Sequence, residues 1–417
     1  MTVQPRVERL EALVDQHNRY RDNCLNMIAS ENVPSPFVER MLSAELDRRY
    51  GYYRGIDLFD RHYWGNRYIA QIEDYAHQVA RELFGVAHVD LRPLSGNLAG
   101  IGAMFALARA GDTVLEVGNG HQYAGKMHRA PLSVELNSIE VPWDGPNYSV
   151  ALDATLELIE QHRPASVSVG SGVFLFPTPV RELKEAMRRT NPDSILIYDA
   201  AHVLGLIAGG RFQDPMAEGA DVMISSTHKT FAGPQGGIIM TNDRRYAELI
   251  GEAMSPLLVA NHHLSRLPAL AATFLEWMHC GPAHADAIVT NAKIFAHALH
   301  ERGVPMLADH LDFTETHMVI PLVDQFGDMR ELSDRMEECH IIGGIFPPPP
   351  EGGTQGLRLG VQELTRLGMT TADAPAVADC VADVLGDRDL AGAKKRATAL
   401  AAGFDKLCFA LDPQNTA

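Results

Sequence analysis

Hydrophobic and polar positions follow two alternating periods along most of the chain. Residues 5–21 carry apolar side chains at helical spacing, whereas the segment 47–66, rich in aromatic residues, arginine and glycine, follows neither a helical nor a strand period. From residue 69 onward, helical segments alternate with short apolar runs, which predicts an α/β domain with a mostly parallel sheet covered by helices on both faces. The helices are expected at 69–85, 97–110, 151–162 and 180–189, and the strands at 113–117, 166–170, 194–199, 221–226 and 237–241.

A long helical stretch over 263–302 leads to a second, shorter set of elements that predicts a smaller α+β domain. A chain of 417 residues exceeds the size at which one hydrophobic core stops growing, so two domains are expected. We expect an N-terminal helix and arm over 1–66, a large domain over 67–290 and a small domain over 291–417. The small domain should contain strand 316–322, helix 328–339, a Pro/Gly-rich turn over 343–356, strand 357–360, helix 373–386 and a last helix over 389–411.

Composition and charge exclude several classes of partner. A formal charge of −17 argues against binding to nucleic acid or to an anionic membrane. The five cysteines are scattered, and the N-terminus lacks the apolar core of a secretory signal, so we expect reduced thiols and a cytoplasmic protein. The apolar runs are shorter than the ~18 residues of a membrane span. His262 and His263 lack a third ligand at a sensible spacing, so no metal site is expected.

Two of the expected strands end in residues that can carry chemistry. Strand 194–199 ends at Asp199, and strand 221–226 leads into Ser226, His228 and Lys229. Ligands of open α/β sheets bind at the carboxyl ends of the strands, where a carboxylate can hold a pyridine nitrogen protonated and a partly buried lysine can form a Schiff base. Taken separately, Asp199 is more simply a turn residue and Lys229 a solvated lysine. The pairing of the two strand ends favours the chemical interpretation.

Two further elements suggest binding of anions. Ser95, Gly96 and Asn97 open the helix at 97–110, where free backbone N–H groups favour a phosphate, although a plain serine N-cap is more common. Arg358 lies within an apolar strand, where its guanidinium group suits the carboxylate of an amino acid or, alternatively, a structural ion pair.

Together these elements resemble the serine hydroxymethyltransferase family, especially its archaeal-type branch. The similar motifs are YDAAHVLGLIAGGRFQDP from residue 198, STHKTFAGPQGG from residue 226, LVANHHL from residue 258, FTETH from residue 313 and GLRLGVQELTRLGM from residue 356. The resemblance implies a pyridoxal 5′-phosphate (PLP) enzyme with an aspartate-aminotransferase-like fold. Such a fold has a mostly parallel seven-stranded sheet in its large domain. The resemblance further implies a homodimer with shared active sites, in which 47–66 is an interface arm.

The resemblance also implies the roles of individual residues at the cofactor and at the substrate. Lys229 would form the Schiff base, Asp199 would pair with the pyridinium nitrogen, and His202 would contact the phenolic oxygen of PLP. For the residue that stacks on the ring of PLP, His121 aligns best, Lys126 and His128 are alternatives, and an exposed loop histidine is the competing interpretation. Ser95, Gly96, Asn97 and Ser226 would complete the cofactor site, with His228 orienting the phosphate or the aldimine, and Ser30, Arg358, Tyr50 and Tyr63 would bind substrate, with Tyr63 also catalytic.

The sequence departs from the family where the family holds folate. Tyr52 stands at the position of the arm glutamate that is implicated in folate-dependent transfer, and a phenol with an ordinary pKa of about 10 is a poor substitute for a carboxylate base. Asp57 or Asp60 could compensate. Ile342–Phe346 replaces an Asn-Lys-Asn-like stretch that helps to hold folate.

These departures favour a folate-independent L-threonine transaldolase or aldolase that adds glycine to an aldehyde through a glycyl quinonoid. Tetrahydrofolate-dependent serine/glycine hydroxymethyl transfer is the alternative, and tetrahydrofolate is therefore a doubtful cofactor. A PLP-binding or interaction protein without aldol catalysis is a third interpretation, which the presence of Lys229, Asp199, His202 and Arg358 together disfavours.

Overall fold

The computed structural model divides the chain into two compact units. The large unit comprises Ser30–Asp286 with Phe409–Ala417, and the small unit comprises Met1–Ala29 with Ala287–Cys408. Helix α11 (Arg266–Glu301) begins in the large unit and ends in the small one. The domain boundaries expected at 66/67 and 290/291 stay predictions. The structure describes residues 3–43, 45–118, 122–123, 135–145, 147–170, 172–346 and 354–412.

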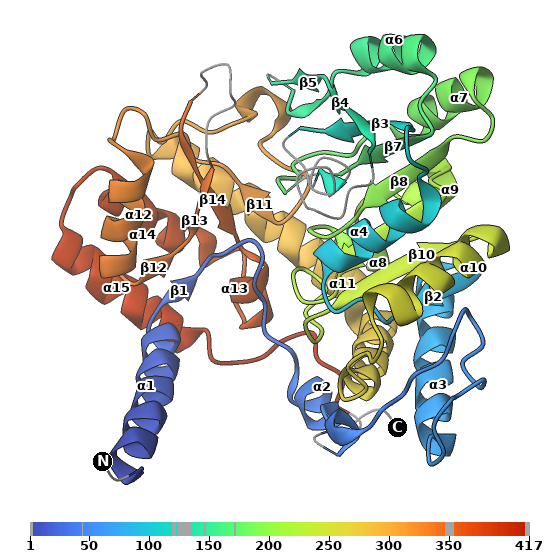
Figure 1. Ribbon diagram of the computed structural model, residues 1–417. Coiled ribbons are helices and arrows are strands. Elements are labelled where there is room, and N and C mark those ends of the chain that lie inside the picture. Colours follow the sequence, from blue (N-terminus) through green and yellow to red (C-terminus); the bar gives the residue numbers. More distant parts are fainter. Residues whose placement is uncertain are drawn as a thin grey trace. The chain divides into compact units, whose positions relative to one another are not determined.

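A seven-stranded sheet forms the centre of the large unit (Figure 1). Strand β10 runs antiparallel to both of its neighbours, and the remaining pairs are parallel, which confirms the predicted mostly parallel sheet. The outer strands β2 and β4 were not expected, because β2 is only 3 residues long and β4 exposes most of its side chains. In spatial order the strands are β2 (His88–Asp90), β10 (Gly237–Thr241), β9 (Val222–Ser226), β8 (Ile195–Asp199), β7 (Ser166–Val169), β3 (Thr113–Val117) and β4 (Asn137–Val141).

Helices pack on this sheet through apolar side chains. Val114, Ile197, Ile224 and Ile239 of four strands form one buried cluster with Ala99 of helix α4. A hairpin of β5 (Trp143–Asp144) and β6 (Ser149–Val150) and two short helical turns, Leu46–Arg48 and Ala253–Leu258, complete the unit. Its helices are α2 (Pro36–Met41), α3 (Arg67–Phe84), α4 (Gly96–Leu107), α6 (Leu152–His162), α7 (Val180–Thr190), α8 (Leu204–Ala208), α9 (Pro215–Glu218) and α10 (Arg244–Glu252).

The small unit combines short strands with helices. Strand β14 (Gly356–Gly360) pairs antiparallel with β11 (Met318–Val319) and with β13 (Gly344–Phe346), and β1 (Leu25–Asn26) pairs parallel with β12 (Ile341–Ile342). The helices are α1 (Gln4–Asp22), α12 (Met329–Glu338), α13 (Gln362–Arg366), α14 (Ala374–Leu385) and α15 (Leu390–Gly403), with a 3₁₀ turn at Asp309–Leu311.

Three expectations for the small unit were wrong in extent. The expected turn 343–356 contains strand β13, because pairing with β14 overrides the local effect of two adjacent glycines. The expected strand 316–322 shortens to Met318–Val319. The expected helix 389–411 ends at Gly403, because Phe404 turns into the hydrophobic core and ends the helical period.

All five cysteines carry free thiols in the folded chain. In the part of the chain that the structure describes, no helix is long and apolar enough to cross a membrane, and no group of three or more His, Cys, Asp or Glu side chains could hold a metal ion. Helix α1 buries none of its residues, so its apolar stripe at Leu10, Leu13 and Val14 is exposed.

Candidate active site

The loop after strand β9 holds Lys229 in a defined place. The Thr227 hydroxyl donates to the Pro234 carbonyl at 2.5 Å, and the Gly233 amide donates to the Thr227 carbonyl at 2.8 Å. The Ala232 amide closes a further turn by donating to the carbonyl of Lys229 at 3.0 Å. These bonds close residues 227–234 into a compact loop, so the lysine side chain leaves the end of the sheet in a fixed direction.

The Lys229 amine meets His202 of the neighbouring strand end. Lys229 Nζ lies 3.1 Å from Nε2 of His202, which is 2% exposed. The Thr230 hydroxyl donates to the His202 carbonyl at 2.9 Å, and the Ser226 hydroxyl donates to the Ala201 carbonyl at 3.1 Å. These hydrogen bonds join the loop after strand β9 to the loop after strand β8. The two loops lie side by side because the two strands are parallel neighbours in the sheet. The structure therefore brings Lys229, His202 and Ser226 together.

Asp199 ends strand β8 as a buried carboxylate that accepts hydrogen bonds from Ala201 and Tyr123. Its Oδ1 accepts the Ala201 amide at 2.9 Å, and its Oδ2 accepts the hydroxyl of Tyr123 at 2.9 Å. Burial, and then the charge of Asp199, raise the pKa of Tyr123, so this phenol stays a donor. Gly100 of helix α4 admits the tyrosine ring, because a Cβ at Gly100 would lie 2.0 Å from the ring. The sequence had not indicated Tyr123, which belongs to no periodic element.

The N-terminus of α4 lies against the same strand ends. Ser95 caps the helix by accepting the Leu98 amide at 3.1 Å, and a Cβ on Gly96 would lie 2.8 Å from the backbone nitrogen of Ser226. Only glycine permits this close approach. The N-terminus of a helix such as α4 favours an anion through its first backbone amides and its dipole.

His228 places an imidazole ring at this end of the sheet. Its buried Nδ1 has no hydrogen-bond partner among the described residues. Burial lowers the pKa of His228 to about 4, helped by the nearby charges of Lys229 and Arg266, so the imidazole is neutral at pH 7. This end of the sheet thus carries a primary amine, a carboxylate, a helix N-terminus and an unsatisfied imidazole. These groups suit the aldehyde, the pyridine nitrogen and the phosphate of PLP. The residues present therefore fit this cofactor.

Arg266 fixes the segment that leads to the N-terminus of α4. This buried guanidinium group, at the start of α11, donates to the carbonyls of Leu91, Pro93 and Gly237 at 2.7, 3.1 and 3.0 Å. Burial lowers its pKa to about 10. Arg266 thus holds the segment before Ser95 onto strand β10. Sequence reasoning missed it, since an arginine that bonds only backbone carbonyls has no sequence signature.

The arm is anchored to the large unit by a buried ionic cluster. Glu73 of α3 is fully buried, and its carboxylate receives the guanidinium of Arg61 at 2.6 Å and the hydroxyl of Tyr53 at 3.2 Å. Nε2 of His262 lies 2.9 Å from the same carboxylate. Arg61 and Tyr53 belong to the arm, whereas His262 belongs to the loop before α11. Glu73 therefore joins two loops that show no periodic pattern of their own.

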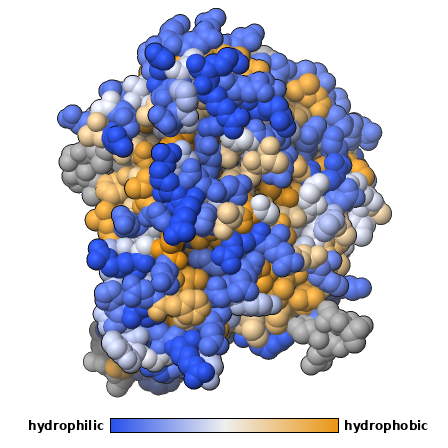
Figure 2. All heavy atoms as spheres, turned by 90° about the vertical axis from the view of Figure 1, so that its right-hand side faces the viewer, coloured by the Kyte–Doolittle hydropathy of each residue, from blue (hydrophilic) through white to orange (hydrophobic). Residues whose placement is uncertain are grey.

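The arm presents several aromatic side chains to the surface. The rings of Tyr50 and Tyr63 lie 4.8 Å apart, and these residues are 43% and 49% exposed. Tyr52 packs edge-on against His62 at 4.8 Å. Trp64 is 94% exposed, which is unusual for so large an apolar side chain. Figure 2 shows apolar patches among hydrophilic residues on one side of the molecule.

Other predicted residues belong to the small unit, adjoin it in sequence or are not described. Arg358 is half-buried on β14 of the small unit, opposite Gly344 of β13. Ala29, the residue before Ser30, is held in the small unit by the imidazole of His317, whose Nε2 lies 3.0 Å from its carbonyl oxygen. His121, the expected ring-stacking residue, and its alternatives Lys126 and His128 lie outside the described residues.

Comparison with known proteins reveals close relatives along the whole chain. The family model for serine hydroxymethyltransferase matches residues 4–381. The serine hydroxymethyltransferase of Methanopyrus kandleri is 39% identical over 404 residues, which cover 95% of this chain and 93% of that protein. That of Sulfolobus acidocaldarius is 35% identical over 401 residues, covering 94% and 92%. The crystal structure of L-threonine transaldolase from Pseudomonas fluorescens, in its internal aldimine state, matches with a TM-score of 0.91 at 25% identity, covering 99% of this chain and 96% of that one.

The fold, the site and these matches define a PLP-dependent transferase. More narrowly, the chain belongs to the serine hydroxymethyltransferase family. The family and the cofactor predicted from the sequence motifs are confirmed. The roles of individual residues stay predictions.

Proposed function

We propose that this enzyme is a folate-independent L-threonine transaldolase or aldolase. It would break the Cα–Cβ bond of L-threonine, release acetaldehyde, and join the remaining glycine unit through Cα to a second aldehyde. The products are acetaldehyde and a new β-hydroxy-α-amino acid, so every atom of threonine and of the second aldehyde is accounted for.

The observation that carries this proposal is Tyr52 in place of the arm carboxylate of the family. Its ring packs against His62 instead of presenting an acid or a base. Asp57 is a weak replacement, because its Oδ1 accepts the Phe59 amide at 3.0 Å and so caps its own turn. The L-threonine transaldolase from Pseudomonas fluorescens, as its structure is titled, shares the fold over nearly the whole chain and adds support.

The chain's own residues would divide the work as follows. PLP, when bound, supplies an aldehyde that condenses with amines and a ring that accepts the electron pair released as the Cα–Cβ bond breaks. Lys229 would hold the cofactor, with His202 beside its amine, and Asp199 would keep the pyridine nitrogen protonated. The remaining roles are binding ones: Ser95, Gly96, Asn97, Ser226 and His228 at the phosphate end, and Arg358 with Ser30 at the substrate carboxylate.

We also propose that two copies of the chain share their active sites and act in the cytoplasm. Tyr50 and Tyr63 would reach the partner's site from the exposed arm, and the exposed stripe of α1 would be covered. A mixture of Tyr63→Phe and Lys229→Ala chains tests this, because each dimer of mixed composition regains one intact site. Activity in the mixture above the sum of the separate variants is expected, and no recovery after subunit exchange would exclude shared sites.

Folate-dependent hydroxymethyl transfer is the second candidate, because relatives at 35% and 39% identity are named serine hydroxymethyltransferase. The holoenzyme is incubated with L-threonine and benzaldehyde without folate, and separately with L-serine and tetrahydrofolate. Formation of phenylserine in the first mixture, faster than glycine in the second, is expected. Glycine formation that requires tetrahydrofolate, without phenylserine, would establish the alternative.

A further inference from the structure

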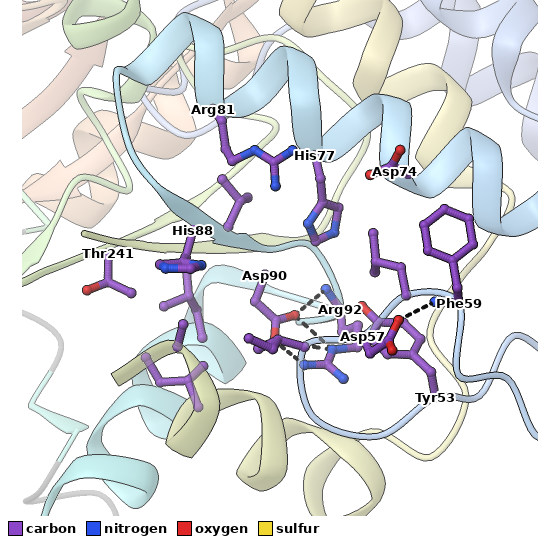
Figure 3. Close-up of a pocket in the computed structure, with 16 residues that line it drawn as sticks. Tyr53, Asp57, Phe59, Asp74, His77, Arg81, His88, Asp90, Arg92 and Thr241 are labelled. Carbon is purple, nitrogen blue, oxygen red and sulfur yellow. Dashed lines mark hydrogen bonds and ion pairs between the residues drawn. The ribbon is translucent and has the colours of Figure 1, made fainter. Parts of the chain in front are cut away.

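A cavity lies in the large unit, between the arm and the edge of the sheet. It has a volume of about 290 Å³ and is bounded by the arm, α3, β2, β10 and α10 (Figure 3). Leu58, Phe59, Ile239 and Ile250 form much of its apolar wall. The proposed catalytic and cofactor-binding residues do not line it. It is therefore a different place from the candidate active site.

Two buried nitrogen atoms at this cavity have no hydrogen-bond partner among the described residues. They are Nη1 of Arg92, a residue that is 2% exposed, and Nε2 of His77, which is 6% exposed. The other guanidinium nitrogens of Arg92 bond Asp90 at 2.5–3.2 Å. Figure 3 shows the His77 ring extending from α3 toward Arg92 and Asp90. The two nitrogens thus mark one polar end of the cavity.

Unsatisfied buried polar groups are rare in folded proteins, and they indicate a missing partner. Nη1 of Arg92 can only donate a hydrogen bond, and Nε2 of His77 donates in the tautomer that carries its proton there, so an acceptor oxygen satisfies both. A cavity with a large apolar wall and a few convergent donors has the usual character of a small-molecule site. Its volume lies at the lower end of the range for such sites, which limits the occupant to a compact molecule.

The charges around the cavity restrict the occupant further. Asp90 neutralises Arg92, and Arg81 adds one more cation to the lining. Asp57 and Asp74 also line the cavity, but they already accept from the Phe59 amide and from Gln78 Nε2, at 3.0 and 2.6 Å. A doubly charged anion such as phosphate is disfavoured by these carboxylates, whereas a guanidinium nitrogen forms a strong, charge-assisted bond with one carboxylate.

We propose that this cavity is a second ligand site for a small monocarboxylate with a compact apolar body. One carboxylate oxygen accepts from Arg92 Nη1 and the other from His77 Nε2, and the body lies against Leu58, Ile239 and Ile250. Because Tyr53 and Leu58 of the arm line the cavity, a bound acid also stabilises the conformation of the arm.

Benzoate is a suitable probe, with benzamide as its uncharged counterpart of nearly the same shape. Binding to the holoenzyme is measured by calorimetry and by the ring resonances of ¹³C-labelled histidine, with the His77 signal assigned by its loss in His77→Leu. We expect saturable binding that shifts the His77 signal, at least tenfold weaker binding of benzamide, and at least tenfold weaker binding of benzoate to His77→Leu. The matched control is His162→Leu, which removes an exposed imidazole from α6 and should leave the affinity unchanged.

A second variant keeps the test decisive if His77→Leu folds poorly. Ala247 of α10 is 7% exposed and lines the cavity, so Ala247→Met should fill part of it and abolish binding. The proposal is overturned if benzoate changes only the visible spectrum of the holoenzyme without moving the His77 signal, because the acid then occupies the substrate site. It is equally overturned if benzamide, inorganic phosphate or benzylamine binds as well as benzoate, or if no probe saturates the protein. None of these readouts depends on transaldol activity.

Discussion

Replacing Glu73 by glutamine should destabilise the enzyme far more than any exposed substitution on the same helix. Glu73 is fully buried and faces Arg61, whose side chain is 5% exposed, at 2.6 Å. Glutamine keeps the shape of the side chain but removes its charge, so the arginine is left buried without compensation. The arm would lose its ionic attachment to α3.

The size of the effect follows from this burial. Removing one partner of a buried ion pair costs about 3–5 kcal/mol, whereas exposed pairs contribute about 0–1 kcal/mol. The substitution also weakens the contacts of the Glu73 carboxylate with Tyr53 and His262. We therefore expect the loss of stability for Glu73→Gln to lie in the upper part of that range. For a chain of 417 residues, such a change lowers the melting temperature by roughly 5 °C.

Scanning calorimetry of the holoenzyme at pH 7 tests this value, with Glu82→Gln as the matched control, because Glu82 is exposed on α3. A double variant that also carries Arg61→Gln should be more stable than the single variant, since it removes the uncompensated cation. If Glu73→Gln melts within about 1 °C of Glu82→Gln, a difference of about 1 kcal/mol or less, the cluster does not hold the arm.

The same cluster predicts a dependence of stability on pH. Burial alone would raise the pKa of Glu73, but the nearby charges of His262 and Arg61 hold it below the ordinary value of 4.5. Because the folded pKa is lowered, the stabilisation is fully present above about pH 4.5 and is lost as the pH falls toward the folded value. The difference in unfolding free energy between the wild-type chain and Glu73→Gln should therefore shrink in acid. A difference that stays constant between pH 7 and pH 3 would contradict this.

Three further predictions concern the candidate active site. Lys229→Ala should abolish turnover and the visible absorbance of the bound cofactor while the melting temperature of the apoprotein changes little; residual turnover would exclude the lysine. Tyr123→Phe removes the donor to Asp199 Oδ2, so the dissociation constant of PLP, measured by titrating the apoprotein, should rise about tenfold, as expected for loss of a ~1.5 kcal/mol bond to a charged group; an unchanged constant would exclude this role. Tyr52→Glu should raise the rate with L-serine and tetrahydrofolate relative to phenylserine formation, and an unchanged ratio of the two rates would show that position 52 does not select the acceptor.

The central sheet could be predicted from the sequence because its strands are short apolar runs with clear ends. Strands β3 and β10 begin and end where the pattern placed them, at 113–117 and 237–241. The site around Lys229 could be predicted for the same reason, since neighbouring parallel strands bring Asp199, His202 and Lys229 to one edge. Strand β4 could not, because its side chains are mostly exposed and carry no apolar pattern.

The contacts that complete the site join segments without a periodic pattern, and this is why they were missed. Tyr123 reaches Asp199 across 76 residues of sequence, and Arg266 reaches Leu91 across 175. Neither residue differs in type from many exposed ones. Their function follows from the space left by other elements, such as the missing Cβ of Gly100, and not from local spacing.

Glu73 had a signal that could have been found. It lies among Ile69, Ala76 and Ala80 on the buried face of α3, where a charged residue is expected only with a partner. The partner could not be named from sequence, because Arg61 comes from an arm with no period. That arm carries Tyr50 and Tyr63 at the surface but buries Tyr53 and Leu58, so apolar packing and directional contacts both hold it. The buried charge of Glu73 therefore adds a directional attachment of the arm to α3, through Arg61 and Tyr53.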